Sequence, residues 1–476
     1  ANFTGSEYDW ALQSFFGRLS YSLNGKYLVD FSTRMDGSSK FAKNKRWSAL
    51  FPSLAVAWNL SEENFIKSLN VFDELKARLS WGQSGNQELS FGNYDYISLI
   101  TISGNYPMGI PNVGLPGAVS SIASENRTWE TIETKNIGID FAIFRSKLSG
   151  SFDYYIKNNK NMLVNEQLPA TLGGTSPTQN IGHLETKGWD FMIRWNDKAG
   201  DFKYGVSFII NDSKNKLIKL RGSDSFSEGL VYAREGYALN SYFGYQFDGI
   251  IQNEDQLASY KKLGNLPAKL NLGDVMFRDV DGDGKITAFG DPAAGTKGDI
   301  VYLGNLNPRY SFSSNINLSY KGFDLNVLLQ GIGKREGVRT GEFSYPLSVV
   351  WEQPLLYYVG KNWTSENTAA RYPRVIPGAV GNDELRNWNW RYSSMRMNNL
   401  AYLKLKDITL AYNIPQTLVS KVKMQNIRVY ISGQDLLTFS KDTWENSFNP
   451  EETWERSDEQ TYPFNSLISI GLDIKF

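Results

Sequence analysis

The segment from Asp279 to Thr287 is the part of this sequence whose residue types and spacing fit a metal site. It reads Asp-Val-Asp-Gly-Asp-Gly-Lys-Ile-Thr. Carboxylates at positions 1, 3 and 5, a glycine at position 6 and a backbone carbonyl at position 7 match the first part of a calcium-binding loop. The predicted ligands are therefore the carboxylates of Asp279, Asp281 and Asp283 and the carbonyl oxygen of Lys285.

Position 12 of this segment departs from the calcium-loop pattern. A bidentate acidic residue is expected there, but the sequence has Gly290. We predict that Asp291, the next residue, substitutes for it. We expect Ca²⁺ or a similar hard cation to stiffen a long loop and to take no part in catalysis. The alternative is a plain turn cluster of Asp and Gly residues.

The composition excludes several other kinds of site. The chain has no cysteine and one histidine, His183, so thiolate and multi-histidine metal centres cannot form. We found no nucleophile-base-acid set, P-loop or dinucleotide fingerprint, and we expect the protein not to be an enzyme. Acidic and basic residues balance at 50 each. A nucleic-acid partner, which needs a concentrated basic face, is therefore not expected.

Aromatic side chains are frequent in the stretch of about residues 333–399, which we predict to be a long loop. Five of them are Trp351, Trp363, Trp388, Trp390 and Tyr392. Such residues stack on sugar rings, pack on a partner protein or pack among themselves. The sequence leaves these three alternatives open.

The elements that position these loops are strands. From Ile468 to Phe476 every even position is apolar, and the odd positions are small, polar or charged. This period of two recurs in about 15 segments, the least regular being near residues 229–234, just before a strand at 241–251. No window approaches the roughly 20 apolar residues of a spanning helix. At residues 403–412 the apolar parity switches, which predicts a bulge near Lys406 and Asp407.

The connections between these segments follow a pattern. Hairpin turns of a few residues alternate with loops that are mostly long and polar, as in outer-membrane barrels. We therefore predict an all-β fold, a transmembrane antiparallel β-barrel with long extracellular loops and short periplasmic turns. A half-buried sheet of a soluble protein is the alternative. An odd number of antiparallel strands cannot close on itself, so we expect residues 1–476 to be one part of a larger barrel.

Several segments resemble the C-terminal half of the SusC/RagA family of TonB-dependent outer-membrane transporters of Bacteroidota. In chain order, the resembling segments are Gly25–Leu28, Asp36–Phe41, Phe51–Ser53, Ala57–Asn59, Ser80–Asn86, Asp279–Thr287, Tyr320–Asp324, Gln330–Gly331, Tyr402–Ile408 and Gly471–Phe476. They extend over nearly the whole chain.

The resemblance implies a 22-stranded barrel, of which this chain supplies about the last 15 strands. It implies that the plug, the TonB-binding box and the first strands are absent from residues 1–476, and that a plug-bearing N-terminal polypeptide is a partner. It further implies import of glycan or peptide fragments across the outer membrane, driven by TonB, with a SusD-like surface lipoprotein and outer-membrane lipid as partners. Arginines on the polar strand faces would line the lumen or contact the plug, namely Arg18, Arg34, Arg78, Arg194 and Arg428.

Two alternative functions follow from the same features. Within the class, the chain could belong to a TonB-dependent receptor for a siderophore or cobalamin. From another class, the candidate calcium loop fits a secreted, calcium-dependent carbohydrate-binding β protein.

Overall fold

The computed structural model describes most of the chain. The described residues are 9–87, 93–94, 96–98, 100–108, 113–120, 122–165, 171, 177–220, 227–291, 293–338, 344, 346–347, 356–376, 383–440, 449–451 and 464–476. Contacts divide the chain into two compact units. The first contains residues 1–194, 212–224 and 234–238, and the second contains residues 195–211, 225–233 and 239–476. None of the described helices is long and apolar enough to cross a membrane.

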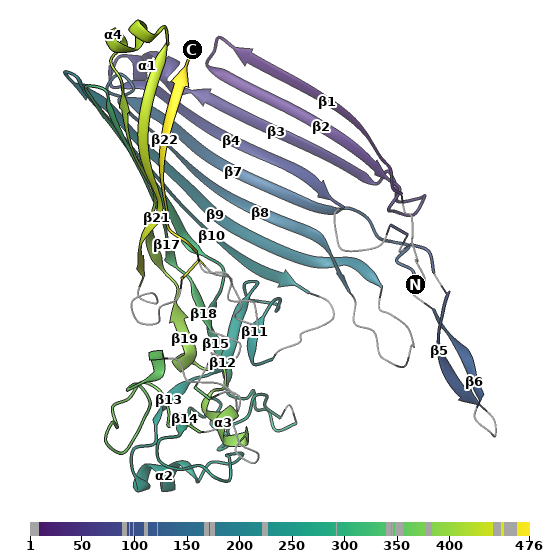
Figure 1. The fold of residues 1–476 in the computed structure, drawn as a ribbon. Helices are drawn as coiled ribbons and strands as arrows, with labels where there is room; N and C mark the ends of the chain where they lie inside the picture. Colours follow the sequence, from purple (N-terminus) through teal and green to yellow (C-terminus); the bar gives the residue numbers. More distant parts are fainter. Residues whose placement is uncertain are drawn as a thin grey trace. The chain divides into compact units, whose positions relative to one another are not determined.

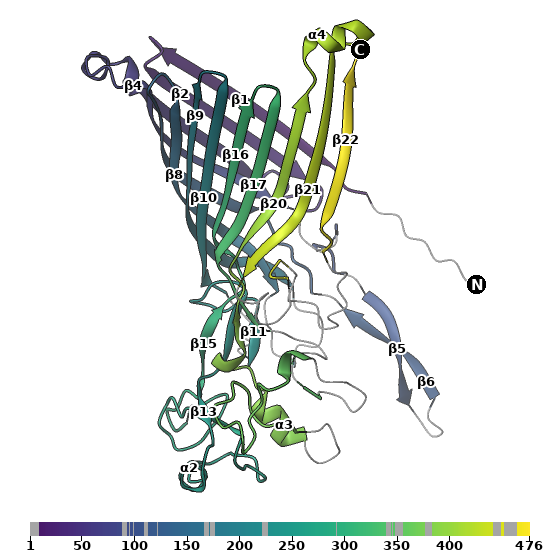
Figure 2. The same ribbon diagram turned by 60° about the vertical axis from the view of Figure 1, so that its left-hand side comes forward.

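Thirteen of the described strands form one sheet, which confirms the predicted all-β antiparallel fold. Its strands, in order across the sheet, are β1 (Leu12–Leu23), β2 (Tyr27–Ser38), β3 (Ala49–Asn59), β4 (Phe72–Asn86), β7 (Glu130–Ile143), β8 (Leu148–Asn165), β9 (Thr178–Ala199), β10 (Phe202–Lys219), β16 (Arg309–Tyr320), β17 (Phe323–Lys334), β20 (Tyr402–Asn413), β21 (Asn426–Ser440) and β22 (Leu467–Lys475). Figure 1 shows β1 to β4, β7 and β8 side by side, and Figure 2 shows β16, β17 and β20 to β22.

One face of this sheet is apolar and exposed. In the first four strands, Leu19 pairs with Phe31, Phe31 with Leu54, and Leu54 with Trp81. The exposed fractions of the first three are 69%, 44% and 41%. No soluble core covers these side chains, and an apolar row on the outer face is what a strand needs in lipid.

The opposite face is polar and carries ion pairs, which join neighbouring strands except for Arg34 with Asp36 within β2. The arginine pairs on it are Arg18 with Asp30 (2.7 Å), Arg34 with Asp36 (2.7 Å), Arg78 with Asp140 (2.7 Å) and Asp153 (2.8 Å), and Arg428 with Asp473 (3.0 Å). Because successive residues of a strand point to opposite faces, the apolar side chains lie on one face and the charged ones on the other, as predicted.

The main sheet has two strands fewer than the predicted count of about 15. The segments at 229–234 and 241–251 instead contribute β11 (Gly229–Val231) and β12 (Ser241–Tyr245), which form a separate sheet with β15 (Ile300–Asn305). All five residues of β12 are buried. A strand covered on both faces is part of a folded core, whereas a barrel strand needs one face in lipid.

The bulge predicted near Lys406 and Asp407 is confirmed. On β17, Leu328 pairs with Asp407 and the next residue, Leu329, pairs with Leu405, so Lys406 is skipped. The pairing with β21 shifts at the same place. The extra residue moves the apolar positions of β20 from odd to even numbers without turning the strand over.

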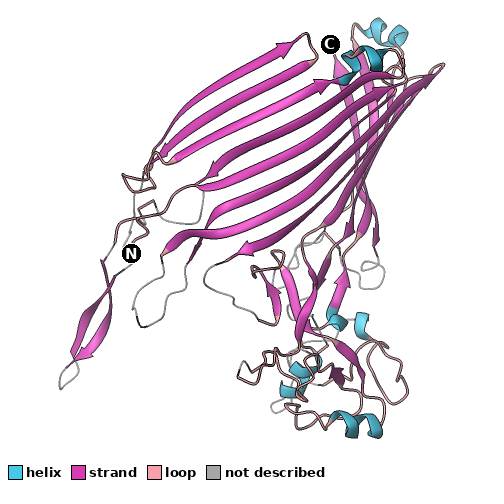
Figure 3. Cartoon of the chain, turned by 180° about the vertical axis from the view of Figure 1, so that it is seen from behind, coloured by secondary structure: helices cyan, strands magenta, loops and turns pink. Residues whose placement is uncertain are grey.

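The connections contain the remaining elements, and Figure 3 shows helices only there. The strands are β5 (Ile100–Met108), β6 (Val113–Ser120), β13 (Phe247–Ile250), β14 (Val275–Phe277), β18 (Glu336–Val338) and β19 (Met397–Asn399). The helices are η1 (Leu60–Glu62), α1 (Asn64–Lys67), α2 (Glu254–Tyr260), η4 (Leu356–Tyr358), α3 (Asp383–Asn389), η5 (Ser394–Arg396), α4 (Gln416–Val419) and η6 (Ser420–Val422).

Candidate functional site

Two long connections of the second unit fold together into one apolar core. We call residues 239–308, from the connection of β10 to β16, and residues 335–401, from the connection of β17 to β20, the loop domain. Its core combines Ile251, Val275 and Phe277 from the first connection with Trp388 and Trp390 from the second. All five side chains are nearly or completely buried. The predicted loops are therefore a folded domain whose two halves lie far apart in the sequence.

The aromatic residues of the second connection hold this core together. Trp388 is 3% exposed, and its Nε1 donates to the carbonyl oxygen of Val275 at 2.9 Å. Trp390 is 5% exposed and stacks on Tyr372 with ring centroids 5.6 Å apart. Of the three alternatives left open by the sequence, these two tryptophans adopt the third, packing within the chain. Buried rings cannot stack on a sugar.

The other predicted aromatic residues differ in their contacts. Trp363 is half-buried, and its Nε1 donates to Gln252 Oε1 at 2.9 Å. The guanidinium of Arg396 lies 5.2 Å from the ring centroid of Tyr392. Trp351 lies outside the described residues.

The candidate cation site lies in the first connection of the loop domain. Carboxylate oxygens of Asp279, Asp281 and Asp299 all lie within 4.8 Å of one another. Oxygens at that spacing can share one Ca²⁺ ion, because its ligands lie at about 2.3–2.6 Å. Among the described residues, no other group of three acidic, histidine or cysteine side chains meets this criterion.

Backbone N–H groups hold the first of these carboxylates in place. Asp279 Oδ1 accepts from Gly282 N at 2.7 Å, and Oδ2 accepts from Gly284 N at 2.9 Å. The chain folds back this tightly because both glycines have positive φ, 74° and 78°. Residues with a side chain rarely adopt a positive φ, which accounts for the glycines in the Asp-Gly-Asp-Gly order.

The other two carboxylates accept from backbone N–H groups of the opposite segment of the loop. Asp281 Oδ2 accepts from Gly298 N (2.6 Å) and Lys297 N (2.9 Å), and these hydrogen bonds lower the pKa of Asp281. Asp299 is fully buried, and burial raises its pKa although Val280 N (2.6 Å) and Thr287 N (2.8 Å) donate to it. A bound cation would favour the ionised form of this buried carboxylate and so offset the cost of its burial.

The remaining predicted ligands occupy nearby turns. Asp283 Oδ1 accepts from Lys285 N at 2.8 Å, and Lys285 forms an isolated bridge with Gly264. Asp291 lies in its own turn, where its Oδ1 accepts from Ala293 N at 2.9 Å. The structure thus brings together Asp279, Asp281 and a residue that the sequence analysis missed, Asp299. The sequence feature that marks Asp299 is weak: a Gly-Asp pair directly before a strand that begins with β-branched residues.

His183, the single histidine of the chain, lies in β9. Its Nε2 lies 3.0 Å from Asn158 Oδ1 of β8. The ring is therefore part of a polar pair between adjacent strands.

Comparison of the sequence with known families identifies one matching family. The model of the TonB dependent receptor-like β-barrel matches residues 1–436. TonB-dependent receptor P3 of Formosa agariphila is 31% identical over 98% of this chain and 45% of its own length. TonB-dependent receptor SusC of Bacteroides thetaiotaomicron is 37% identical over 49% of this chain and 25% of its own length. The chain spans about half the length of the curated relatives that match nearly all of it.

The fold is also similar to a solved structure. The RagAB peptide transporter superposes with a TM-score of 0.74 over 98% of this chain and 48% of that chain, at 22% identity. At this level of identity the likeness concerns the fold.

Proposed function

This chain belongs to the TonB-dependent receptor β-barrel family, in its SusC/RagA branch, and we propose that it forms part of an importer of glycan or peptide fragments. The family is located in the outer membrane and consists of transporters, not enzymes. This location excludes the secreted carbohydrate-binding alternative. TonB would supply the energy, as the family name indicates.

The observation that carries the proposal is the folded core of the loop domain. Loops that only cap a barrel need no core, because exposed loops gain little from burial. Here Asp274 is completely buried and accepts hydrogen bonds from Arg374 and Asn389, which ties the two connections together. A rigid surface of this kind suits a protein partner, and a SusD-like surface lipoprotein is the partner that we propose.

A solved relative is named for one of the two substrate classes, since the fold resembles the RagAB peptide transporter. Glycan fragments are the second class because the resemblance to the SusC/RagA family implies them. A polar lumen-facing wall with arginine and carboxylate side chains fits either ligand, since both carry many hydrogen-bonding groups.

Uptake by cells that carry the full-length receptor tests this function. We expect accumulation of a fluorescent oligopeptide or oligosaccharide that is lost when TonB is deleted, and a lipoprotein that co-purifies with the receptor. Uptake of a labelled iron chelate or cobalamin instead would favour the siderophore or cobalamin alternative. Uptake that is unchanged without TonB would contradict both.

A cation at the acidic loop is the second part of the proposal. Asp279, Asp281 and Asp299 would hold Ca²⁺ with carboxylate oxygens, which are the ligands that this ion prefers. The ion would cross-link residues 279–287 to residues 297–299 and so rigidify the loop domain. Backbone N–H groups already orient all three carboxylates.

Terbium luminescence or calorimetry on the full-length protein tests the cation site. We expect Ca²⁺ binding that Asp299→Asn reduces at least about tenfold, because one charged ligand of a hard cation is lost. Asp291→Asn is the matched control and should bind like the wild type, since Asp291 lies in a separate turn. Equal binding by the wild type and Asp299→Asn would refute this site.

A further inference from the structure

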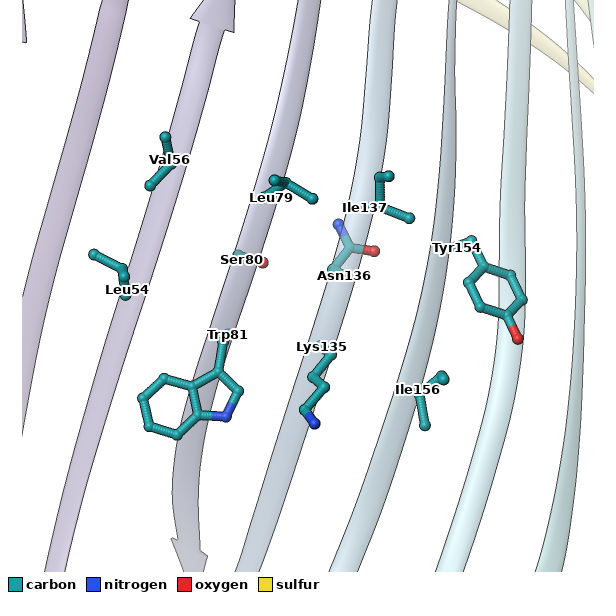
Figure 4. Close-up of a pocket in the computed structure, with 10 residues that line it drawn as sticks. All are labelled: Leu54, Val56, Leu79, Ser80, Trp81, Lys135, Asn136, Ile137, Tyr154 and Ile156. Atoms are coloured by element: carbon teal, nitrogen blue, oxygen red, sulfur yellow. The ribbon is translucent and has the colours of Figure 1, made fainter.

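An apolar groove crosses the exposed face of β3, β4, β7 and β8, all within the first unit. It has a volume of about 690 Å³ and is lined mainly by apolar side chains. Figure 4 shows Leu54 and Val56 on one side, Leu79 and Ile137 between, and Tyr154 on the other side. Leu79 and Ile137 are 58% and 55% exposed. In the outer membrane this surface faces acyl chains.

One end of the groove carries more positive than negative charge. Lys135 lines the groove, and its Nζ lies 3.5 Å from Glu133 Oε1. Lys160 pairs with the same carboxylate, and Trp81 Nε1 donates to it at 3.2 Å. Glu133 is 10% exposed at its side chain, whereas Lys135 and Lys160 are 61% and 49% exposed. Two ammonium groups therefore share one buried carboxylate.

The neighbouring basic residue on β9 does not add to this surplus. Lys187 Nζ lies 2.9 Å from its own partner, Glu185 Oε1. The unbalanced positive charge at this end is thus that of Lys135 and Lys160.

The position along the strand places this charge at a membrane interface. β7 ends at Ile143, next to the short turn, and Lys135 lies eight residues before it. At about 3.3 Å per residue and a strand tilt of roughly 40°, the height difference is about 20 Å. The apolar band of an outer-membrane barrel is about 25 Å tall. Lys135 therefore lies near the border of the leaflet on the side of the long loops, which is the outer leaflet.

We propose that this groove is a specific binding site for a phosphorylated, multi-acyl lipid of the outer leaflet. An acyl chain would lie in the groove between Leu54 and Ile137, and a head-group phosphate would bind the ammonium groups of Lys135 and Lys160. Trp81 lies beside them, as aromatic residues do at a membrane border. An acyl chain alone would need neither lysine. An anionic head group, in contrast, pairs with the positive charge that Glu133 leaves unbalanced on Lys135 and Lys160.

Native mass spectrometry of the full-length receptor tests this site. The protein is extracted from outer membranes, delipidated in mild detergent and titrated with bis-phosphorylated lipid A, dephosphorylated lipid A or phosphatidylethanolamine. We expect the wild type to bind bis-phosphorylated lipid A in preference to the other two. The variant Lys135→Gln/Lys160→Gln should lose about tenfold in occupancy through its missing charge-assisted contacts.

Two further variants separate the groove from the general lipid surface. Val56→Trp fills the groove and should also lower occupancy, whereas Val206→Trp changes an equally exposed apolar residue of β10 and should not. Lys67→Gln, at a lysine paired with Glu62 at the short-turn end, is the control for charge. Equal binding by wild type and charge variant, retained binding in Val56→Trp, or no preference for phosphate would each overturn the proposal and indicate annular lipid only.

Discussion

Asp274 and Arg374 form a bidentate ion pair, with Nε 2.8 Å from Oδ1 and Nη2 3.0 Å from Oδ2. The carboxylate is completely buried, and Asn389 Nδ2 donates to it at 2.9 Å. These three residues come from both connections of the loop domain. We therefore expect the two connections to fold together, which makes this pair a test of the cooperativity of the domain.

Replacement of Asp274 by alanine should unfold the loop domain locally. The change leaves Arg374 and the amide of Asn389 without their buried partner, which costs about 3 kcal/mol or more. Proteolysis of the purified receptor under native conditions should show faster cleavage within residues 239–308 and 335–401. The control is Asp248→Ala, because Asp248 pairs with Arg278 at 2.7 Å but is 45% exposed. That change should cost about 0–1 kcal/mol; equal cleavage of both variants would contradict the prediction.

The loop domain should lose stability in alkaline solution. Burial raises the pKa of Tyr245 to about 12, although Arg391 opposes the shift, and the ordinary value of tyrosine is about 10. As pH rises, the Tyr245 hydroxyl therefore loses its proton in the unfolded state before it does so in the folded state. The free energy of unfolding of the loop domain is unaffected below about pH 10 and falls as pH rises toward 12. This fall amounts to about 2–3 kcal/mol. Burial also raises the pKa of Tyr260, which adds to the loss of stability at alkaline pH.

Absorbance of the phenolate during a pH titration measures this effect. Tyr245→Phe should flatten the dependence of loop-domain stability on pH above 10, and Tyr232→Phe should leave it unchanged, because Tyr232 is 61% exposed. Titration of Tyr245 near pH 10 in the folded protein would show that the ring is accessible to water.

The two hydrogen bonds of Tyr260 give another prediction for the same domain. Its hydroxyl donates to the carbonyl oxygen of Phe277 at 3.0 Å and accepts from Phe277 N at 2.7 Å. Tyr260→Phe leaves both buried backbone groups unpaired, which costs about 1–3 kcal/mol. Thermal unfolding or hydrogen exchange at Phe277 should report the loss. Unchanged protection of the Phe277 amide would mean that water replaces the hydroxyl.

The barrel wall was predictable because its signal is local. Alternation at single-residue resolution placed Leu19 and Phe31 on the apolar face, and it located the bulge at Lys406 from a change of parity. Each of these inferences needs only neighbouring residues, since a strand imposes a fixed period of two. The resemblance of ten short segments to the SusC/RagA family predicted the family in addition to the fold.

The loop domain was not predictable in the same way. Trp388 packs beside Phe277 and donates to Val275, more than a hundred residues earlier in the chain. No periodicity connects such segments, so the sequence left them as loops. The cation site shows the same limit: the spacing identified Asp279 and Asp281, but Asp299 reaches them only through the fold of the loop.

Arg78 joins three strands of the main sheet, and its loss should weaken the barrel wall. Its guanidinium donates to both oxygens of Asp140 (2.7 and 2.8 Å) and to both of Asp153 (2.9 and 2.8 Å). Arg78→Ala would leave two half-buried carboxylates facing each other, and after allowance for solvent screening we expect a loss of about 1–3 kcal/mol. The temperature at which the folded barrel converts to the unfolded band in gel electrophoresis measures it. Arg18→Ala removes an arginine that is 69% exposed and, within the described part of the chain, pairs with Asp30 alone, so its conversion temperature should fall less. An equal fall for both variants would show that the second carboxylate at Arg78 adds nothing.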